Sequence, residues 1–444
     1  MQHRPHVVVI GGGFGGLAAA RALAKAPVNV TLIDRRNHHL FQPLLYQVAT
    51  AALNPGDIAY PLRAALATQR NARVLLAAAT SIDVANRRVV LDDGQLAYDY
   101  LVVATGATHS YFGRDDWAPV APGLKSIEDA LEIRRRIFLA YEAAERESDP
   151  VAQREWLTFA VVGAGPTGGE LAGALGEIGL QTLAHDFRTI DPTEVRVVLF
   201  EGRDRILGAY PAKLSAAAKR SLERRAVDVR LNTQVTAIDA GGVTVKAAGR
   251  EERIGARTVL WAAGVRASSL ADSLGAPRDS SGRVEVLPDL SIPGHPEVFV
   301  IGDLAKMMMP DGTQVPGVAQ GALQGGRHVA KLIAAEVRVN TMVTAIDAAG
   351  VTVKTGDGEE RIGTRTVLWA AGVSASPLAE YLGTPRDRTG RVIVEPDLSI
   401  ADHREVFVIG DLARMISDGV EVPGVAQGAI QGGRHVAKII SREV

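Results

Sequence analysis

Short apolar runs alternate with segments of helical periodicity at the start of the chain. The runs Val7–Ile10 and Val28–Ile33 predict buried strands, and the segment from Gly15 to Ala26 between them predicts a helix. Leu101–Ala104 predicts a further buried strand. Because buried strands joined by helices pack as a parallel sheet with crossover helices, the pattern predicts an α/β fold.

Two more strand-like runs and a long helix follow. Arg73–Ala79 and Arg88–Leu91 are expected to form strands of a smaller sheet. A helical stretch from Ser126 to about Glu147 leads into a second strand–helix unit, which runs from Trp156 to about Val265. Two α/β units are therefore expected in succession.

The C-terminal part of the chain contains an internal repeat. Val229–Glu336 (copy one) and Val337–Val444 (copy two) are near-copies, displaced by 108 residues and then by 107 after one loop. VRLNTQVTAID returns as VRVNTMVTAID, GARTVLWAAGV returns as GTRTVLWAAGV, and VFVIGDLA and VPGVAQGA each occur twice. This period is too long for a solenoid unit, so the repeat indicates a tandem duplication. Neither copy contains a glycine-rich nucleotide turn, so neither is expected to build a nucleotide site alone.

Length and charge narrow the class of protein. A chain of 444 residues can hold two or three domains with buried cores. The net charge of -1 gives no electrostatic reason to bind nucleic acid or anionic lipid. A strand is expected almost at the N-terminus, and no apolar run reaches the roughly 18 residues of a spanning helix. We therefore expect a cytoplasmic protein without a signal peptide.

Cysteine is absent from the sequence. This excludes disulfides, thiolate metal sites and flavoenzymes that relay electrons through a protein disulfide. The adjacent His38 and His39 have poor spacing for metal ligands, and surface or loop packing is expected for them. No metal site is predicted.

Two glycine-rich turns follow apolar strands. The first, GGGFGG at Gly11 to Gly16, places Gly11 and Gly13 where a tight turn and a close backbone approach to a pyrophosphate are needed. Asp34 ends the next strand, 21 residues after Gly13, where a carboxylate accepts hydrogen bonds from a ribose diol. The alternative for Asp34 is a solvated strand end.

The second turn, GAGPTG, contains Gly163, Gly165 and Gly168. Glu201 ends the strand that follows, at a longer spacing than usual. A carboxylate here favours NADH because it would repel the extra phosphate of NADPH, although Arg203 lies close enough to weaken that preference. Two dinucleotides in one chain imply electron transfer between them.

The sequence GDLA occurs at Gly302–Ala305 and again at Gly410–Ala413. Its aspartate, Asp303 or Asp411, is expected to contact the ribityl or phosphate region of a flavin, and capping of the next segment is the alternative. VPGVAQGA then opens a helix at Ala319 or Ala426. A helix N-terminus aimed at the flavin ring would stabilise the anionic reduced flavin.

Glu170 lies just inside the helix after the second turn. One interpretation is a first-turn charge that complements the helix dipole. The other places Glu170 between a nicotinamide and the flavin.

The most specific segment is NHHLFQPLLYQVATAALNPGDIAYPLR at Asn37–Arg63. LVVATGA, VVGAGPTGGELAGAL, VLWAAGV, VFVIGDLA and VPGVAQGAIQGG accompany it. Together these segments resemble type II NADH:quinone oxidoreductases, single-subunit FAD enzymes with two dinucleotide-binding domains. The resemblance covers residues 1 to about 336 in family order.

The resemblance implies an α/β fold with two Rossmann-like domains and a duplicated C-terminal segment. The FAD-binding domain is expected at 1–118 and 267–336, and the NAD-binding domain at 119–266. Residues 337–444 duplicate 229–336 and are expected to pack peripherally or to be swapped between chains.

The resemblance also assigns site residues. It implies FAD on Gly11, Gly13, Gly16, Asp34, Ala79, Thr105, Gly106 and Asp303, and NADH on Gly163, Gly165, Gly168 and Glu201. Further cofactor contacts are expected at Gly15, Arg35, Gln42, Ala104, Ala263, Gly264, Gly302, Ala319, Asp411 and Gln427. Glu170 matches the glutamate beside the nicotinamide–flavin contact, and Gln320 and Gln324 match a pair near the quinone, as do Gln427 and Gln431.

The C-terminus departs from the family pattern. Copy two stands where the family has amphipathic helices that seat it on the membrane. Copy one follows the second glycine turn directly, and the longer loop to copy two adds a closure penalty of roughly 0.9 kcal/mol. Copy one is therefore expected to build the sites.

The predicted activity is hydride transfer from NADH to FAD, followed by electron delivery to a quinone-type acceptor. A soluble NADH-dependent reductase of a small redox protein is one alternative, and a non-catalytic flavin-binding remnant of recombination is another. A homodimer or a domain swap is a further expectation. Peripheral attachment to the inner face of the cell membrane is the alternative to a purely cytoplasmic location.

Overall fold

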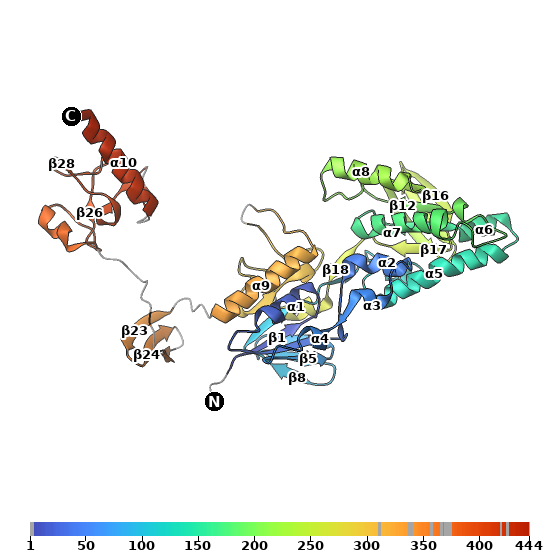
Figure 1. The fold of residues 1–444 in the computed structure, drawn as a ribbon, viewed down its shortest axis with the longest axis horizontal. Helices are drawn as coiled ribbons and strands as arrows, with labels where there is room; N and C mark the ends of the chain where they lie inside the picture. The colour runs from blue at the N-terminus through green and yellow to red at the C-terminus, as the bar shows by residue number, and fades with distance from the viewer. Residues whose placement is uncertain are drawn as a thin grey trace. The chain divides into compact units, whose positions relative to one another are not determined.

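The computed structural model describes residues 4–309, 312–335, 341–355, 358–364, 367, 375–417, 420–422 and 426–443. The chain forms two compact units, unit 1 from Met1 to Val337 and unit 2 from Arg338 to Val444. Unit 1 contains two parallel sheets with helices packed against them (Figure 1). The expected α/β fold with two Rossmann-like domains is confirmed.

The first domain of unit 1 is built on a six-stranded sheet with the strand order β20-β21-β9-β1-β2-β5. Neighbouring strands run parallel except β20, which pairs antiparallel with β21. The strands are β1 (His6–Ile10), β2 (Asn29–Asp34), β5 (Ala72–Leu76), β9 (Tyr100–Val103), β20 (Ser291–Ile292) and β21 (His295–Val300). A strand of copy one therefore completes a sheet that begins at the N-terminus.

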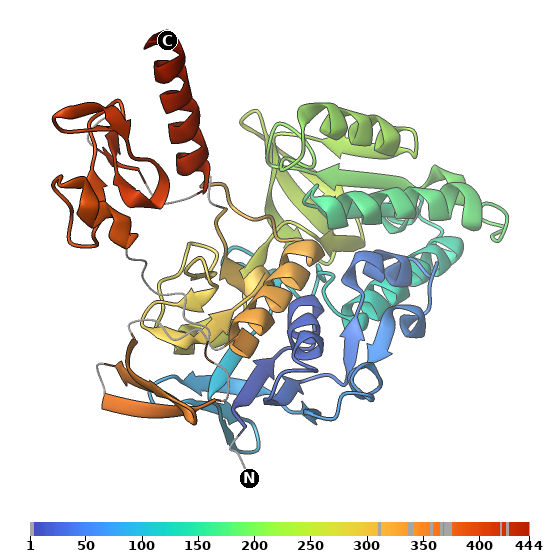
Figure 2. The same ribbon diagram turned by 60° about the vertical axis from the view of Figure 1, so that its left-hand side comes forward.

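Helices α1 (Phe14–Ala22) and α9 (Ala319–Ala335) lie side by side in this domain (Figures 1 and 2). A Cβ atom on Gly326 of α9 would collide with the backbone oxygen of Gly15, so glycine permits the close approach of the two helices. Helix α1 ends at Ala22 and not at the expected Ala26, because the next residues close tighter turns, with the amide of Ala26 donating to Leu23 O at 3.0 Å.

A smaller antiparallel sheet contains β6 (Ala79–Asp83), β7 (Arg88–Leu91) and β8 (Gln95–Ala97). The prediction for Arg88–Leu91 is confirmed, but the prediction that Arg73–Ala79 lies in this sheet is wrong. Most of that run forms β5, which pairs in parallel with β2 at the edge of the six-stranded sheet. An edge strand is buried on one side only, with Val74 buried and Arg73 exposed, so its alternation resembles that of a half-exposed antiparallel strand.

The second domain of unit 1 has a four-stranded parallel sheet in the order β13-β12-β11-β17. Its helices pack on one face of this sheet, and the antiparallel sheet β14-β15-β16, which follows β13, packs on the other. The strands are β11 (Thr158–Val162), β12 (Arg196–Phe200), β13 (Val227–Arg230), β14 (Thr233–Asp239), β15 (Gly242–Ala247), β16 (Arg250–Gly255) and β17 (Thr258–Trp261). The helices are α5 (Ile127–Arg146), α6 (Pro150–Trp156), α7 (Pro166–Glu177) and α8 (Ala212–Glu223).

Helix α5 confirms the long helix expected from Ser126. Ser126 is its N-cap and accepts a hydrogen bond from the amide of Asp129 at 3.1 Å, while the Asp129 carboxylate accepts one from the amide of Ser126 at 2.9 Å. Glu132 accepts hydrogen bonds from Arg135 and Arg136, and Arg136 also donates to Val120 O at 2.9 Å. These contacts tie α5 to the loop before it.

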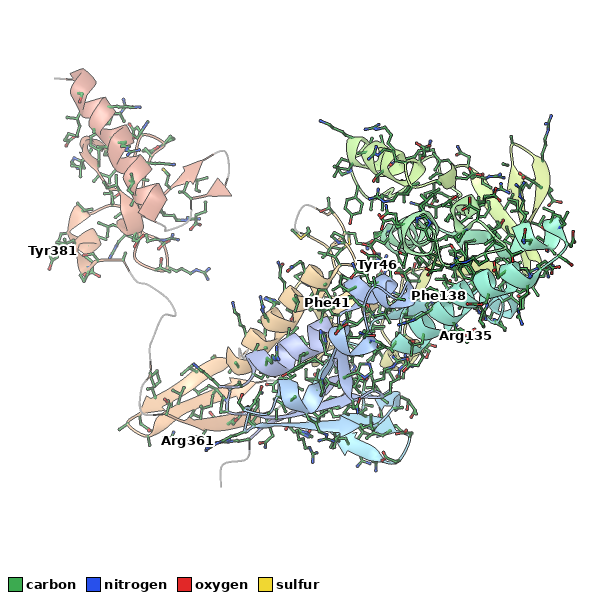
Figure 3. The ribbon with its side chains drawn as sticks, turned by 45° about the vertical axis from the view of Figure 1, so that its right-hand side comes forward. Phe41, Tyr46, Arg135, Phe138, Arg361 and Tyr381 are labelled. Carbon is green, nitrogen blue, oxygen red and sulfur yellow. The ribbon has the colours of Figure 1, made fainter. Side chains whose placement is uncertain are left out.

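The segment that carries the most specific family pattern bridges the two domains. It contains β3 (His38–Leu40), α2 (Leu45–Ala49), α3 (Pro55–Ile58), β4 (Ala59–Pro61) and α4 (Leu62–Ala65). Helix α2 packs against α5 and α7 of the second domain, in the region where Figure 3 shows Phe41, Tyr46 and Phe138. Strands β10 (Ala107–His109) and β18 (Val265–Ala267) pair antiparallel as a further connection between the domains.

Within the described residues, unit 2 repeats elements of copy one in the same order. Its antiparallel sheet β23 (Met342–Asp347), β24 (Gly350–Thr355) and β25 (Gly358–Gly363) corresponds to β14-β15-β16. Later elements are β26 (Val392–Ile393), β27 (Ser399–Ile400), β28 (His403–Phe407), β29 (Ala413–Arg414) and α10 (Ala426–Glu443). The repeat of VLWAAGV in copy two lies outside the described residues, apart from Val367.

Candidate active site

The first glycine turn joins β1 to α1. Gly11 has a φ of 103°, and a Cβ atom there would lie 2.5 Å from the backbone oxygen of Ala104. Only glycine fits this position, because both the backbone angle and the contact with the end of β9 exclude a side chain. Gly13 is the N-cap of α1 and carries no side-chain cap, so the first amides of α1 are left for another acceptor.

The second glycine turn repeats this geometry between β11 and α7. Gly163 has a φ of 98°, and a Cβ atom there would collide with the backbone of Ala263 at the end of β17. Gly165 is the N-cap of α7, again without a side-chain cap. A Cβ atom on Gly13 or Gly165 would meet no protein atom within 4 Å, so both turns have space for a phosphate group in front of them.

Two carboxylates hold the two turns in matching ways. Asp34, at the end of β2, accepts hydrogen bonds from the amides of Gly12 at 2.6 Å and Arg36 at 2.7 Å. Glu201, just after β12, accepts them from the amides of Ala164 at 3.0 Å and Arg203 at 3.0 Å. The remaining lone pairs of each carboxylate are oriented by the same bonds that fix the turn, as recognition of a ribose diol requires.

The end of β9 contributes the second side of the first site. Ala104, Thr105 and Gly106 follow this strand, and Ala104 packs against Gly11. The hydroxyl of Thr105 is buried and has no hydrogen-bond partner within the protein. Because buried hydroxyls are nearly always paired, this atom points to a polar group of a bound molecule. The uncapped helix start at Gly13, the accepting carboxylate of Asp34 and the hydroxyl of Thr105 therefore together fit a dinucleotide such as FAD.

The GDLA segment of copy one follows β21, a strand of the same six-stranded sheet. Gly302 has a φ of 71°, and Asp303 lies in a short 3-10 turn directly after β21. A Cβ atom on Gly317 would be 3.4 Å from the Asp303 carboxylate, which places the loop before α9 beside this aspartate. Ala319 opens α9, and Gln320 and Gln324 are exposed on its first turns.

Other predicted cofactor positions lie around these turns. Gly15 and Gly16 are buried in α1, and Ala79 begins β6. Arg35 is exposed next to Asp34, while Gln42 donates to Lys125 O at 3.3 Å. Ala263 and Gly264 connect β17 to β18, where Gly264 O accepts a hydrogen bond from the amide of Ser110.

Glu170 lies in the first turns of α7, on the surface near the second glycine turn. Its side chain remains more than a third exposed, and partial burial of the carboxylate raises its pKa. A raised pKa favours a neutral carboxyl that can donate a proton or a hydrogen bond, as expected of a group at a reaction site.

The sequence interpretation missed the role of His39. Its ring nitrogen Nδ1 lies 2.9 Å from the backbone oxygen of Gly12, and its ring packs edge-on against Phe14 with centroids 5.0 Å apart. Phe14 in turn packs against Phe41. His39 therefore supports the first glycine turn, a role that its position in the most specific family segment could have suggested.

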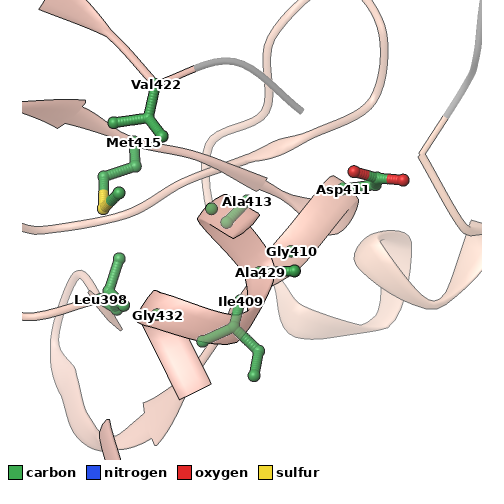
Figure 4. A pocket seen from close by; sticks show the side chains of 10 residues that line it. Leu398, Ile409, Gly410, Asp411, Ala413, Met415, Val422, Ala429 and Gly432 are labelled. Atoms are coloured by element: carbon green, nitrogen blue, oxygen red, sulfur yellow. The ribbon is translucent and has the colours of Figure 1, made fainter. Parts of the chain in front are cut away.

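Copy two carries counterparts of these residues in unit 2. Asp411 follows β28 in a 3-10 turn with Gly410 at a φ of 68°, and Gln427 lies in the first turn of α10. A small pocket with about 30 Å³ of water-accessible space lies beside them, lined by Leu398, Ile409, Met415 and Gly432 among others (Figure 4). Unit 2 therefore repeats the GDLA turn and its helix, but it contains no glycine-rich nucleotide turn.

Among the residues that the structure describes, no group of three or more His, Asp or Glu side chains could hold a metal ion. None of the described helices is long and apolar enough to cross a membrane.

The family model for pyridine nucleotide-disulphide oxidoreductases matches residues 5–326 and again 329–433. The chain is 50% identical over 343 residues to the type II NADH:quinone oxidoreductase Ndh of Mycobacterium tuberculosis, covering 75% of this chain and 73% of that protein. It is 33% identical, also over 343 residues, to the type II NADH:quinone oxidoreductase of Staphylococcus haemolyticus, covering 75% of this chain and 82% of that protein.

Solved structures share the fold. The structure of NDH2 from Plasmodium falciparum in complex with NADH superposes with a TM-score of 0.69 at 17% identity, covering 82% of this chain and 92% of the other. The sulfide:quinone oxidoreductase from Aquifex aeolicus gives a TM-score of 0.62 at 22% identity, covering 80% and 85%. With the paired glycine turns and their carboxylates, the sequence matches show that this chain belongs to the type II NADH:quinone oxidoreductases, within the pyridine nucleotide-disulphide oxidoreductase family.

Proposed function

We propose that the protein oxidises NADH through a bound FAD and passes the electrons to a quinone-type acceptor. The observation that carries this proposal is the pair of glycine turns, each held by a carboxylate from the following strand of its own sheet. The 50% identity to a type II NADH:quinone oxidoreductase over 343 residues supports the same activity.

In this proposal, residues 1–118 and 267–336 form the FAD-binding domain and residues 119–266 form the NAD-binding domain. The six-stranded sheet supports the first assignment, because β21 of copy one pairs with β9. The FAD would lie along Gly11, Gly13, Asp34 and Thr105, with NADH along the second turn. Residues 337–444 would be peripheral to both sites or exchanged between chains.

Bound FAD supplies the hydride and electron chemistry, and the protein supplies its alignment and its electrostatic environment. The uncapped N-termini of α1 and α7 would hold the two pyrophosphates. Asp303 would hold the flavin near its ribityl chain, and the N-terminus of α9 would favour negative charge on the reduced ring. Glu170 would position the nicotinamide or handle a proton, while Gln320 and Gln324 would face the acceptor.

We further propose peripheral attachment to the inner face of the cell membrane at the start of α9. Met308, Met309 and Val318 are each about half exposed, with 51%, 50% and 46% of their surface accessible. Exposed apolar side chains in the loop that leads into α9 suit an acceptor that partitions into lipid. A homodimer is also part of this proposal.

Anaerobic mixing of the purified, FAD-loaded protein with NADH tests the activity. The flavin absorbance should bleach, and addition of a short-chain quinone analogue should restore it. Protein that binds no FAD, or a bound flavin that NADH does not bleach, would contradict the proposal. Recovery of the colour with a small iron–sulfur protein but not with the quinone would instead identify a reductase of a small redox protein.

A further inference from the structure

A pocket lies at the edge of the six-stranded sheet where β1, β2 and β5 begin. It has a volume of about 410 Å³, and its polar lining includes His6, Thr31, Arg70, Asn71 and Arg73. The first glycine turn lies at the opposite edge, because β1 runs from His6 to Ile10 and ends directly before that turn. About 13 Å of strand therefore separate the pocket from the turn. A molecule bound in the pocket would not occupy the place of a nucleotide.

The charge of this pocket is positive. Arg70 and Arg73 are both exposed, and none of the described residues that line the pocket is acidic. Among the described residues, neither arginine forms an ion pair. Burial lowers the pKa of His6, and Arg73 lowers it further, against opposing effects of the Ala97 backbone and of Asp99. The ring of His6 is therefore neutral at pH 7, and the two guanidinium groups supply the charge of the pocket.

Thr31 fixes the guanidinium group of Arg73. Thr31 is 1% exposed on β2, and its hydroxyl oxygen accepts a hydrogen bond from Nε of Arg73 at 2.9 Å. The same oxygen lies 2.8 Å from Nε2 of His6. Thr31 and Arg73 are also paired directly across β2 and β5. Because this contact uses only Nε, the two terminal nitrogens of Arg73 remain as donors in a fixed orientation.

The loop that carries Arg70 is held on both sides of this residue. Before it, Nε2 of Gln69 donates a hydrogen bond to Ala20 O at 2.8 Å. After it, Nδ2 of Asn71 donates to three backbone oxygens in residues 23–28, at 3.0, 3.3 and 3.1 Å. A ligand therefore meets Arg70 on a backbone that is already ordered, which reduces the entropy lost on binding.

Asn71 also contributes an unpaired acceptor. Its Oδ1 atom is buried and has no hydrogen-bond partner within the protein. The hydrogen bonds of Nδ2 to carbonyl oxygens identify which end of the amide is the acceptor. Because buried polar atoms are nearly always paired, Oδ1 points to a donor on a bound molecule, and a hydroxyl group would supply it.

The number of donors favours a phosphate over a carboxylate. A carboxylate has two oxygens, which a single guanidinium group can engage in a bidentate pair. A phosphate monoester has three terminal oxygens, so it can accept hydrogen bonds from Arg70 and Arg73 together. The volume of the pocket lies in the range of sites for small organic ligands. It therefore has room for the group that the phosphate esterifies.

We propose that this pocket binds a phosphate ester of a hydroxylated molecule, such as a sugar phosphate. The phosphate lies on Arg70 and Arg73, and a hydroxyl group of the ligand donates to Oδ1 of Asn71. The site lies outside both glycine turns and does not depend on the proposed activity.

Isothermal titration calorimetry of the full-length, FAD-loaded protein tests this site, with NAD⁺ in excess to fill the second glycine turn. The probes are glucose 6-phosphate, ribose 5-phosphate and glycerol 3-phosphate. At least one of them should bind once per chain. Arg70→Gln changes an exposed side chain and should raise its Kd about 10- to 100-fold, the loss expected when hydrogen bonds to a charged group are removed. The matched control Arg250→Gln removes an exposed arginine from β16 and should leave the Kd unchanged.

A charge-conserving variant distinguishes a built site from a positively charged surface. Arg73→Lys keeps the charge but loses the bond to Thr31 and the planar fork, so it should raise the Kd about 10-fold. Inorganic phosphate and citrate should bind more weakly than the ester. The proposal is overturned if none of the three esters binds, or if inorganic phosphate or citrate binds as tightly as the best of them. An unchanged Kd in Arg70→Gln or Arg73→Lys, with an unaltered melting temperature, would also overturn it.

Discussion

At the scale of single residues, the carboxylates of Asp34 and Glu201 each accept two backbone hydrogen bonds around a glycine turn. The spacing from the turn could predict that a carboxylate stands at the end of the next strand. It could not predict the bonds to Gly12 and Ala164, because these depend on backbone angles within the turn. His39 was missed for the same reason, since its contact with Gly12 crosses from one loop to another.

Substitution of each carboxylate tests which glycine turn binds which cofactor. Glu201→Ala should raise the KM for NADH about 10- to 100-fold, the loss expected when hydrogen bonds to a charged group are removed. Its FAD content should not change. Asp34→Ala should instead lower the FAD retained after gel filtration, measured as flavin absorbance per chain. The reverse pattern would mean that the two turns are assigned to the wrong nucleotides.

The raised pKa of Glu170 predicts how flavin reduction depends on pH. Burial raises its pKa above the ordinary value of 4.5, so the neutral form persists to higher pH and the charged form destabilises the fold above that value. The rate of flavin reduction by NADH should therefore change with pH above 4.5, and Glu170→Gln should flatten this change. The melting temperature of Glu170→Gln should also rise relative to wild type as the pH increases from acid to neutral.

The exposed Glu142 of α5 provides the control for this experiment. Glu142→Gln should leave the pH profile of flavin reduction as it is in the wild type. If Glu170→Gln reduces its flavin with an unaltered rate and pH profile, Glu170 has no role in proton handling or in positioning the nicotinamide.

At the scale of elements, the packing of helices is what a single sequence conveys least. The periodicity predicted α9 and α10 equally well, because their sequences are nearly the same. Only the structure shows that α1 covers α9, with Gly326 against the backbone of Gly15. Strand β5 gives a second example, since alternation identified a strand but not the sheet to which an edge strand belongs.

The two helices form a matched pair for a stability measurement. Gly326→Ala should destabilise unit 1 by about 1–3 kcal/mol, because its Cβ would collide with the backbone of Gly15. At Gly433 a Cβ atom would meet only the side chain of Ile409, at the ordinary contact distance of 3.6 Å. Gly433→Ala should therefore be neutral or stabilise α10 by up to about 1 kcal/mol through helix propensity.

Urea unfolding of the two variants, followed by flavin fluorescence and by circular dichroism, measures both effects. Flavin release should shift to lower urea for Gly326→Ala and stay in place for Gly433→Ala. Equal effects of the two substitutions would show that α9 and α10 have equivalent surroundings in solution.

At the scale of the whole molecule, the sequence predicted the family and the two-domain α/β fold, and both are confirmed. The glycine turns, the strands behind them and the specific segment at Asn37–Arg63 were sufficient for this. The role of copy two could not be predicted, because its residues Ile409, Gly433, Ala437 and Ile440 are the same as their equivalents in copy one. Since both copies carry these residues, the sequence alone cannot decide which copy packs beside α1 and β9.

The two GDLA aspartates therefore provide the test of which copy completes the FAD site. Asp303 lies in unit 1, directly after the strand that pairs with β9, whereas Asp411 lies in unit 2. Asp303→Asn should lower FAD retention, because an amide removes the negative charge and one acceptor that the flavin side would use. Asp411→Asn should leave FAD content and NADH oxidation at the wild-type level. If only Asp411→Asn lost FAD, copy two would complete the FAD-domain sheet in solution. A partial loss of FAD in both single variants would mean that copy one completes the FAD site in some molecules and copy two in others. Each substitution would then remove FAD only from the molecules whose site its own copy completes.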